Sequence, residues 1–280
     1  MTLPRLNLGE FVHSLLRIVL GQPHIPPSLA NNALLQVILR RRSVRHFSSR
    51  PIPDDVFAAI LEAGRLAPSG VNLQTWTFAP FTADEWQATF GRPIPFRGQR
   101  AILIMGDTHR AKSVLDVFPD SPLVEYTIAV MNASLAAMNM NLAAEALGVS
   151  SVMLSETGRS GFLDAAYLRE TLRLPDGVTP LMTLVLGYAS RPYPPMPPKL
   201  PLAEITFKGV YREADPVIMR DWLAQMIAGY KASHLDSSFQ AQVQVYLYKI
   251  GQAEAELQRS LFAGRTRHAH NTTEPNLQDG

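Results

Sequence analysis

A run of basic residues near position 40 is the first part of the sequence that could carry chemistry. Arg40-Arg41-Arg42-Ser43-Val44-Arg45 follows an apolar segment with helical spacing, so we expect it at the end of a helix. Arginine makes charge-assisted, often bidentate hydrogen bonds to phosphate. Helix capping explains the same run, because cations in the last turn interact favourably with the helix dipole. The run alone therefore predicts either a phosphate site or a capped helix end.

A second cluster, Ala67–Trp76, combines turn residues with side-chain amides. Ser69, Asn72 and Gln74 lie between a predicted helix and a predicted strand. Their side chains can both donate and accept hydrogen bonds. Turn chemistry also explains this segment, since Pro, Ser, Gly and Asn are common turn residues. By itself the segment does not identify a ligand.

The elements that must position these clusters alternate between helical and strand-like patterns. The longest helical pattern, Val124–Leu147, is apolar on nearly every face, which indicates burial on most sides. The stretch from Gly187 to Pro201 is rich in proline and predicts an extended arm. The other predicted helices are Phe11–Leu20, Leu29–Arg41, one between Pro53 and Pro68, Leu163–Leu172, Asp215–Tyr230 and Phe239–Phe262. The predicted strands are Thr75–Ala79, Ala101–Gly106, Val149–Leu154 and Leu181–Tyr188.

Composition excludes several kinds of chemistry. The 280 residues include no cysteine, so disulfides, thiol catalysis and thiolate-ligated metals are excluded. The formal net charge of +2 is too small to indicate a nucleic-acid or membrane surface. No window approaches the roughly 20 apolar residues of a membrane span. We expect a cytoplasmic protein without nucleic-acid or membrane partners. We also expect no metal site, because His268 and His270 lie in the C-terminal tail and no cysteine accompanies them.

The two clusters, taken together and in this order, resemble the opening of the nitroreductase family of flavin enzymes. Leu142–Ser151 is similar to the family's central helix and its glycine exit, and Leu184–Tyr188 followed by Lys199–Leu202 is similar to its last core strand and arm. The resemblance implies an α+β fold, with a mixed sheet flanked by helices in an intertwined homodimer. The expected organisation is an N-terminal arm and helix (1–30), an FMN-binding domain (31–210), a helical extension (211–263) and a disordered tail (264–280).

The resemblance also implies a function. It predicts an FMN-dependent oxidoreductase that passes electrons from NAD(P)H, a transient donor, to a small organic acceptor such as a nitroaromatic or a quinone. The implied mechanism is ping-pong, and the protein supplies no acid or nucleophile in the first half-reaction.

Site residues follow from the resemblance position by position. Arg41, Arg42, Ser43 and Arg45 match contacts to the phosphate and ribityl chain, and Lys199 matches a late cation that closes on the phosphate. The residues that match contacts to the isoalloxazine ring, partly from the neighbouring subunit, are Pro68, Ser69, Asn72, Gln74, Asn132, Met153, Leu154 and Ser155.

The sequence leaves alternatives open for the reaction, for the kind of protein and for the packing of the last predicted helix. Met153–Glu156 stands where the best-known branch of the family has a Pro-x-Glu-Gly segment, so dehalogenation, dehydrogenation or flavin breakdown are alternative reactions. A non-enzymatic protein that binds a phosphorylated ligand is a further alternative. Phe239–Phe262 has one apolar face, which predicts packing either across a partner subunit or on its own subunit.

Overall fold

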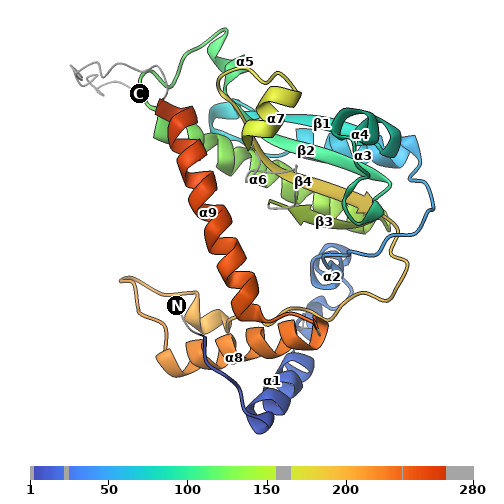
Figure 1. The fold of residues 1–280 in the computed structure, drawn as a ribbon, viewed down its shortest axis with the longest axis vertical. Helices are drawn as coiled ribbons and strands as arrows, with labels where there is room; N and C mark the ends of the chain where they lie inside the picture. The colour runs from blue at the N-terminus through green and yellow to red at the C-terminus, as the bar shows by residue number, and fades with distance from the viewer. Residues whose placement is uncertain (1–2, 22–24, 156–164, 235, 263–280) are drawn as a thin grey trace.

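One four-stranded sheet forms the centre of the protein. The computed structural model describes residues 3–21, 25–155, 165–234 and 236–262. The strands are β1 (Trp76–Thr82), β2 (Arg100–Asp107), β3 (Ser150–Leu154) and β4 (Val178–Gly187). They lie in the order β1-β2-β4-β3, and each neighbouring pair is antiparallel (Figure 1). The strand patterns in the sequence are thus confirmed as strands, and the apolar run at Ala101–Gly106 is central.

The prediction of a mixed sheet is wrong for these four strands. Parallel pairing in the described residues is limited to one isolated bridge between Ser43 and Ser151. The error has a physical reason, because hydrophobic patterning identifies a strand without carrying its direction. Direction is decided by connections: β1 is joined to its antiparallel neighbour β2 through α4 (Ala83–Phe90), and β3 is followed in the chain by its antiparallel neighbour β4.

Helices cover both faces of the sheet. On one face, α3 (Asp54–Arg65) and α6 (Pro122–Ala146) share a core with β2 and β4. On the other, α4 and α7 (Ala165–Thr171) share a second core with β2, β3 and β4. The remaining helices are α1 (Leu8–Leu20), α2 (Ala33–Arg40), α5 (His109–Lys112), α8 (Pro216–Ser233) and α9 (Phe239–Phe262).

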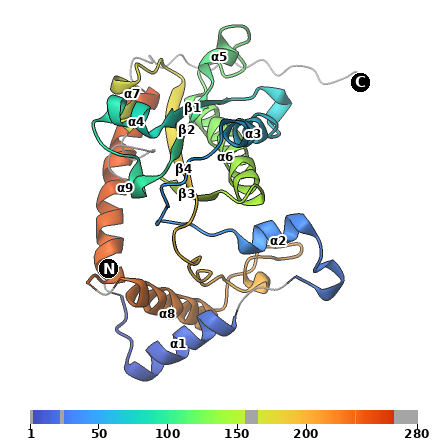
Figure 2. The same ribbon diagram turned by 90° about the vertical axis from the view of Figure 1, so that its right-hand side faces the viewer.

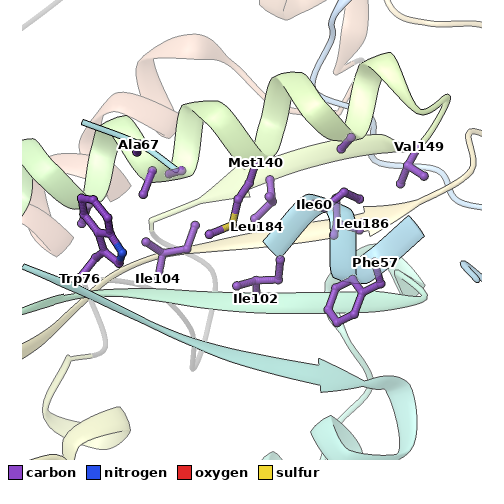
Figure 3. Packing of buried hydrophobic residues seen from close by; sticks show 14 of the residues in the cluster. Phe57, Ile60, Ala67, Trp76, Ile102, Ile104, Met140, Val149, Leu184 and Leu186 are labelled. Carbon is purple, nitrogen blue, oxygen red and sulfur yellow. The ribbon is translucent and has the colours of Figure 1, made fainter. Parts of the chain in front are cut away.

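Strand β2 shows why two cores form. Ile102 and Ile104 belong to the α6 side, whereas Ala101 and Leu103 belong to the α4 side. This alternation follows from the two-residue period of a strand. Every residue of β2 except Arg100 is buried, as expected for a strand covered on both faces. Figure 3 shows Ile102 and Ile104 packed beneath Met140 of α6.

Helix α6 lies close to the sheet and to α3. Its buried residues include Ala133, Ala136 and Ala137, whose small side chains permit a close approach. Gly64 of α3 faces Met140, and a Cβ at this glycine would lie 2.1 Å from the Met140 Cε. The helix ends at Ala146 with Leu147 as its C-cap, and Gly148 follows in the left-handed region at a φ of +74°, which suits the predicted glycine after the helix.

The opposite side of α6 is exposed and apolar. Val124, Met131, Leu135 and Met138 recur at spacings of three, four and seven residues, and each is 46–61% exposed. Burial of α6 on most sides is therefore not achieved within one chain.

The N-terminal arm and the C-terminal extension pack together. Helix α1 lies along α8, and Arg17 pairs with Asp221 at 3.1 Å. Figures 1 and 2 show these two helices away from the sheet, with α9 running from α8 back to the core. Helix α2 begins at Ala33 rather than Leu29, because the Asn32 side chain caps it by accepting from the Leu35 N–H. The predicted tail at 264–280 lies outside the described residues.

We predict that Met140→Ala lowers the free energy of unfolding by about 2–5 kcal/mol, because it leaves a cavity between α6, α3 and the sheet. Val114→Ala is the control, since Val114 is 88% exposed and its truncation should cost less than ~0.5 kcal/mol. Urea unfolding measures both changes. Equal losses in the two variants would contradict this account of the core.

Candidate active site

The basic run is held against the start of β3. Helix α2 ends at Arg40, and the following residues run beside β3 through the Ser43–Ser151 bridge. The Val44 N–H donates to the Ser151 carbonyl at 2.9 Å. Val44 is buried, whereas Ser43 is half-buried and Arg45 is exposed, so the extended backbone directs neighbouring side chains to opposite sides.

The arginines of this run do not share one role. Arg42 donates to the carbonyls of Leu39 and Arg41 at 2.7 and 2.8 Å, so it caps α2. Burial, and secondly the neighbouring Arg41 charge, lower the pKa of Arg42. In the described part of the chain, neither Arg41 nor Arg45 forms an ion pair, and Arg45 makes one long bond to the Ser43 carbonyl. The capping interpretation therefore holds for Arg42, and Arg41 and Arg45 remain available to an anion.

A polar cluster that sequence reasoning missed lies beside these arginines. A cavity of about 610 Å³ is lined by Arg40, Arg42, Glu145 and Tyr193, among others. Burial raises the pKa of Glu145, while its hydrogen bond from Tyr193 and the charges of the three arginines oppose that shift. Burial also raises the pKa of Tyr193. No sequence spacing signals this cluster, because Glu145 and Tyr193 meet only through the fold.

The turn between α3 and β1 is strained and exposed. Val71, Asn72 and Gln74 have positive φ angles of 44°, 55° and 49°. The left-handed region costs a non-glycine residue roughly 1–2 kcal/mol. The Ser69 hydroxyl holds the turn by accepting from the Gln74 N–H at 3.0 Å. Pro68, Asn72 and Gln74 are exposed, so the amides face solvent, and strain of this kind is typical of functional turns.

Two buried asparagines of α6 form hydrogen bonds next to the two clusters, one at the strained turn and one at the basic run. Asn132 is 4% exposed and donates to the Thr75 hydroxyl at 2.8 Å, at the base of the turn. Asn141 is 3% exposed and accepts from the Ser151 hydroxyl at 2.7 Å, behind the Ser43 bridge. In this structure the amide nitrogen of Asn132 donates to the turn, and its predicted contact with the flavin stays a prediction.

The other predicted residues differ in exposure. Met153 is half-buried on the α6 side of the sheet, and Leu154 is buried in the core on the other side. A contact between Leu154 and a cofactor would therefore use its main chain. Ser155 and Lys199 are exposed, and Glu156 lies outside the described residues.

The structure does not bring the two clusters together within one chain. The basic run lies where β3 begins, at the end of the sheet marked by Arg100 and Leu186. The strained turn precedes Trp76, which pairs with Gly106 at the opposite end. Six strand steps separate the two ends, which corresponds to ~20 Å. Helices cover both faces between them, so one ligand cannot reach both clusters of the same chain through the sheet.

A second cavity lies elsewhere. It has a volume of about 660 Å³ between α6, α7 and the end of α9, and no predicted site residue lines it. Glu125 in its wall accepts from the Lys112 ammonium at 2.6 Å. Within the described ranges, no group of three His, Asp or Glu residues could hold a metal ion, and no helix is long and apolar enough to cross a membrane.

Comparison with known sequences identifies the family. Residues 38–188, more than half of the chain, match the nitroreductase family. The chain therefore belongs to the nitroreductase family and is an enzyme of the class that includes NAD(P)H nitroreductases and FMN reductases. It is 33% identical over 160 residues to an Archaeoglobus fulgidus protein named as an NADH dehydrogenase/NAD(P)H nitroreductase, covering 55% of this chain and 84% of that one. It is 26% identical over 190 residues to the NADPH-flavin oxidoreductase of Vibrio harveyi, covering 65% and 76%.

Solved structures show the same fold. The chain superimposes on NfrA2 of B. megaterium with a TM-score of 0.67 at 21% identity, over 82% of this chain and 97% of that one. It superimposes on the NADPH:FMN oxidoreductase of Vibrio harveyi with a TM-score of 0.64 at 23% identity, over 81% and 98%. The α+β fold expected from the sequence is confirmed.

We predict that Thr75→Val lowers the free energy of unfolding by about 1–3 kcal/mol, because it leaves the buried Asn132 amide without its acceptor. Asn132→Leu should cost a similar amount. The double variant should lose less than the two single losses added together, since removing both partners leaves no unpaired group. Urea unfolding of all four proteins measures the coupling, and strictly additive losses would refute the interaction.

Proposed function

We propose that this protein is an FMN-dependent oxidoreductase that transfers electrons from NAD(P)H to a nitroaromatic or quinone-like acceptor. The observation that carries the proposal is the pair Arg41 and Arg45 beside Ser43: two cations without ion pairs in the described chain, on a backbone that is bridged to β3 at Ser43. The names of relatives support it. They include an FMN reductase [NAD(P)H] of Bacillus subtilis and an oxygen-insensitive NADPH nitroreductase of Salmonella typhimurium.

The basic run fits the phosphate of FMN. A phosphate monoester carries a charge of about −1.5 to −2 at neutral pH and accepts several hydrogen bonds. The run follows the C-terminus of α2, where the helix dipole favours cations and gives an anion no support. Binding must therefore come from the arginines, with Arg41 and Arg45 as charged donors and Ser43 as a neutral one.

The strained turn fits the flavin ring. Asn72 and Gln74 present exposed amides that can pair with the polar edge of a heteroaromatic ring, and Pro68 adds an apolar contact. When bound, FMN would accept a hydride from NAD(P)H and deliver electrons to the acceptor in a ping-pong sequence. The protein's part is to hold the ring, and to place one of the basic side chains near its pyrimidine edge, where it stabilises developing negative charge.

Two copies of the chain are needed to complete this site. Within one chain the basic run and the strained turn lie at opposite ends of a covered sheet, as the strand register indicates. A homodimer would place the turn of one subunit beside the basic run of its partner. The exposed apolar stripe of α6 supports this assembly, because it offers the kind of surface that stable dimers bury.

Helix α9 is compatible with such a dimer. Its Ala253 is buried and Leu257 is half-buried, where its last turns meet α6 and α7 of the same chain. Its first half leaves Val245, Leu247 and Ile250 exposed. We propose that a partner subunit covers this first half. Helix α9 would then pack on its own subunit through its last turns and on the partner subunit through its first half, which combines the two alternatives predicted from the sequence.

We predict that Arg41→Ala raises the dissociation constant for FMN by roughly 10- to 100-fold, which corresponds to the loss of a charge-assisted bond. Arg92→Ala is the control, because Arg92 is an exposed arginine in the turn after α4. Flavin fluorescence titration of the apoprotein measures both. If Arg41→Ala and Arg45→Ala retain FMN as tightly as the wild type, the phosphate assignment is wrong. A protein that cannot be loaded with FMN at all would refute the proposed function.

We predict that Leu135→Glu converts the protein to a monomer and releases FMN, because it places a charge in the apolar stripe of α6. Val114→Glu introduces the same charge at an exposed valine outside the stripe and should leave the assembly intact. Sedimentation velocity at low micromolar concentration, recorded at protein and flavin wavelengths, follows both quantities. A wild-type monomer that carries FMN would contradict the shared site.

A further inference from the structure

The arm between β4 and α8 is unusually stiff. Six of the eleven residues from Arg191 to Pro201 are proline. Proline fixes φ near −65°, and runs of this kind favour the extended polyproline conformation. The structure has no helix or strand in this stretch, in agreement with the arm expected from the sequence. In a stiff arm, the points at which the arm is attached to the rest of the protein determine where the neighbouring residues of the arm lie.

The first attachment point is Tyr193. Its hydroxyl donates to the Glu145 carboxylate at 3.2 Å and lies 2.9 Å from the Ser150 hydroxyl. A carboxylate can only accept, so the tyrosine proton goes to Glu145 and the Ser150 hydroxyl donates to the tyrosine oxygen. The Ala189 N–H in turn donates to the Ser150 oxygen at 3.3 Å. These hydrogen bonds join Tyr193, which is 37% exposed, to the end of α6 and to the start of β3.

The second attachment point is Trp222 of α8. Its indole N–H donates to the carbonyl of Pro198 at 3.4 Å. Pro198 directly precedes Lys199, the cation expected to close on the phosphate. The two anchored residues, Tyr193 and Pro198, are five residues apart, or ~16 Å in a polyproline helix. The arm is thus held at both ends, and its first anchor lines the same cavity as Arg40 and Arg42.

We propose that Tyr193 and Trp222 are positioning residues that hold Lys199 at the phosphate end of the cofactor site. This inference rests on the proposed function. A lysine side chain is flexible, and ordering both its stem and a mobile backbone would reduce affinity. Anchoring the proline-rich arm at two points orders its backbone before the ligand binds, so binding no longer includes the entropy cost of ordering that backbone. The anchors act through Lys199, so their effect should be confined to ligands that carry a phosphate.

The test compares FMN with riboflavin, which has the same ring system without the phosphate. Tyr193→Phe and Trp222→Phe keep the aromatic rings and remove the hydrogen bonds. Each should raise the dissociation constant for FMN roughly 3- to 10-fold and leave that for riboflavin unchanged. In a Lys199→Ala background, which itself should weaken FMN about tenfold or more, neither should have a further effect. Tyr211→Phe, at a tyrosine that is 67% exposed, is the control.

Three results would overturn the inference. The first is an equal loss of FMN and riboflavin affinity in the anchor variants, which indicates general disruption of the site. The second is an anchor effect that persists fully in the Lys199→Ala background. The third is a Lys199→Ala protein that binds FMN normally while Arg41→Ala does not; that result rejects the role of the arm and leaves the proposed function standing. Failure of the wild type to bind FMN rejects both.

Discussion

The close contact between α6 and the sheet is the constraint on which the rest of the structure depends. Its alanines bring the helix backbone near the strands, and two buried asparagines on the same side reach opposite ends of the sheet. Asn132 supports the strained turn and Asn141 supports the start of β3. Nine residues of helix separate them, which corresponds to ~14 Å. One rigid element therefore sets the spacing between the two halves of the candidate site.

The same constraint would leave the proposed cofactor site incomplete in a single chain. A helix that covers the sheet between the basic run and the strained turn prevents one ligand from touching both. The helix also leaves its outer apolar stripe without a cover. In the proposed homodimer, a second subunit would cover the exposed stripe of α6 and would also complete the site. Activity and assembly would then depend on each other.

The arginines of the basic run have a nearby counter-charge, Glu145, that does not form a salt bridge with them. Glu145 lies near three arginines, yet it accepts its hydrogen bond from Tyr193 and forms no ion pair with them in the described structure. A direct salt bridge would occupy the guanidinium groups that the proposed phosphate contact needs. An indirect counter-charge reduces the repulsion between adjacent cations and leaves their donors available, which is useful at a site that must stay open for a ligand.

The sequence by itself determined the family, the α+β class and the positions of most helices and strands, because these depend on local periodicity, turn residues and ordered motifs. It identified Arg41, Ser43 and Arg45 as candidate ligands and the proline-rich arm as extended. For Arg42 the sequence predicted either helix capping or phosphate binding; its hydrogen bonds to the carbonyls of Leu39 and Arg41 show the capping, and the phosphate contact stays a prediction.

Tertiary structure alone decided the direction of the strands, the burial of Asn132 and the meeting of Glu145, Ser150 and Tyr193. These depend on contacts between residues that are far apart in the chain, and neither periodicity nor spacing encodes such contacts. It also decided that the two halves of the site lie at opposite ends of one sheet. Local sequence patterns indicate which residues can bind a ligand. Only the packing of α6 on the sheet determines which of these residues can contact the same ligand molecule.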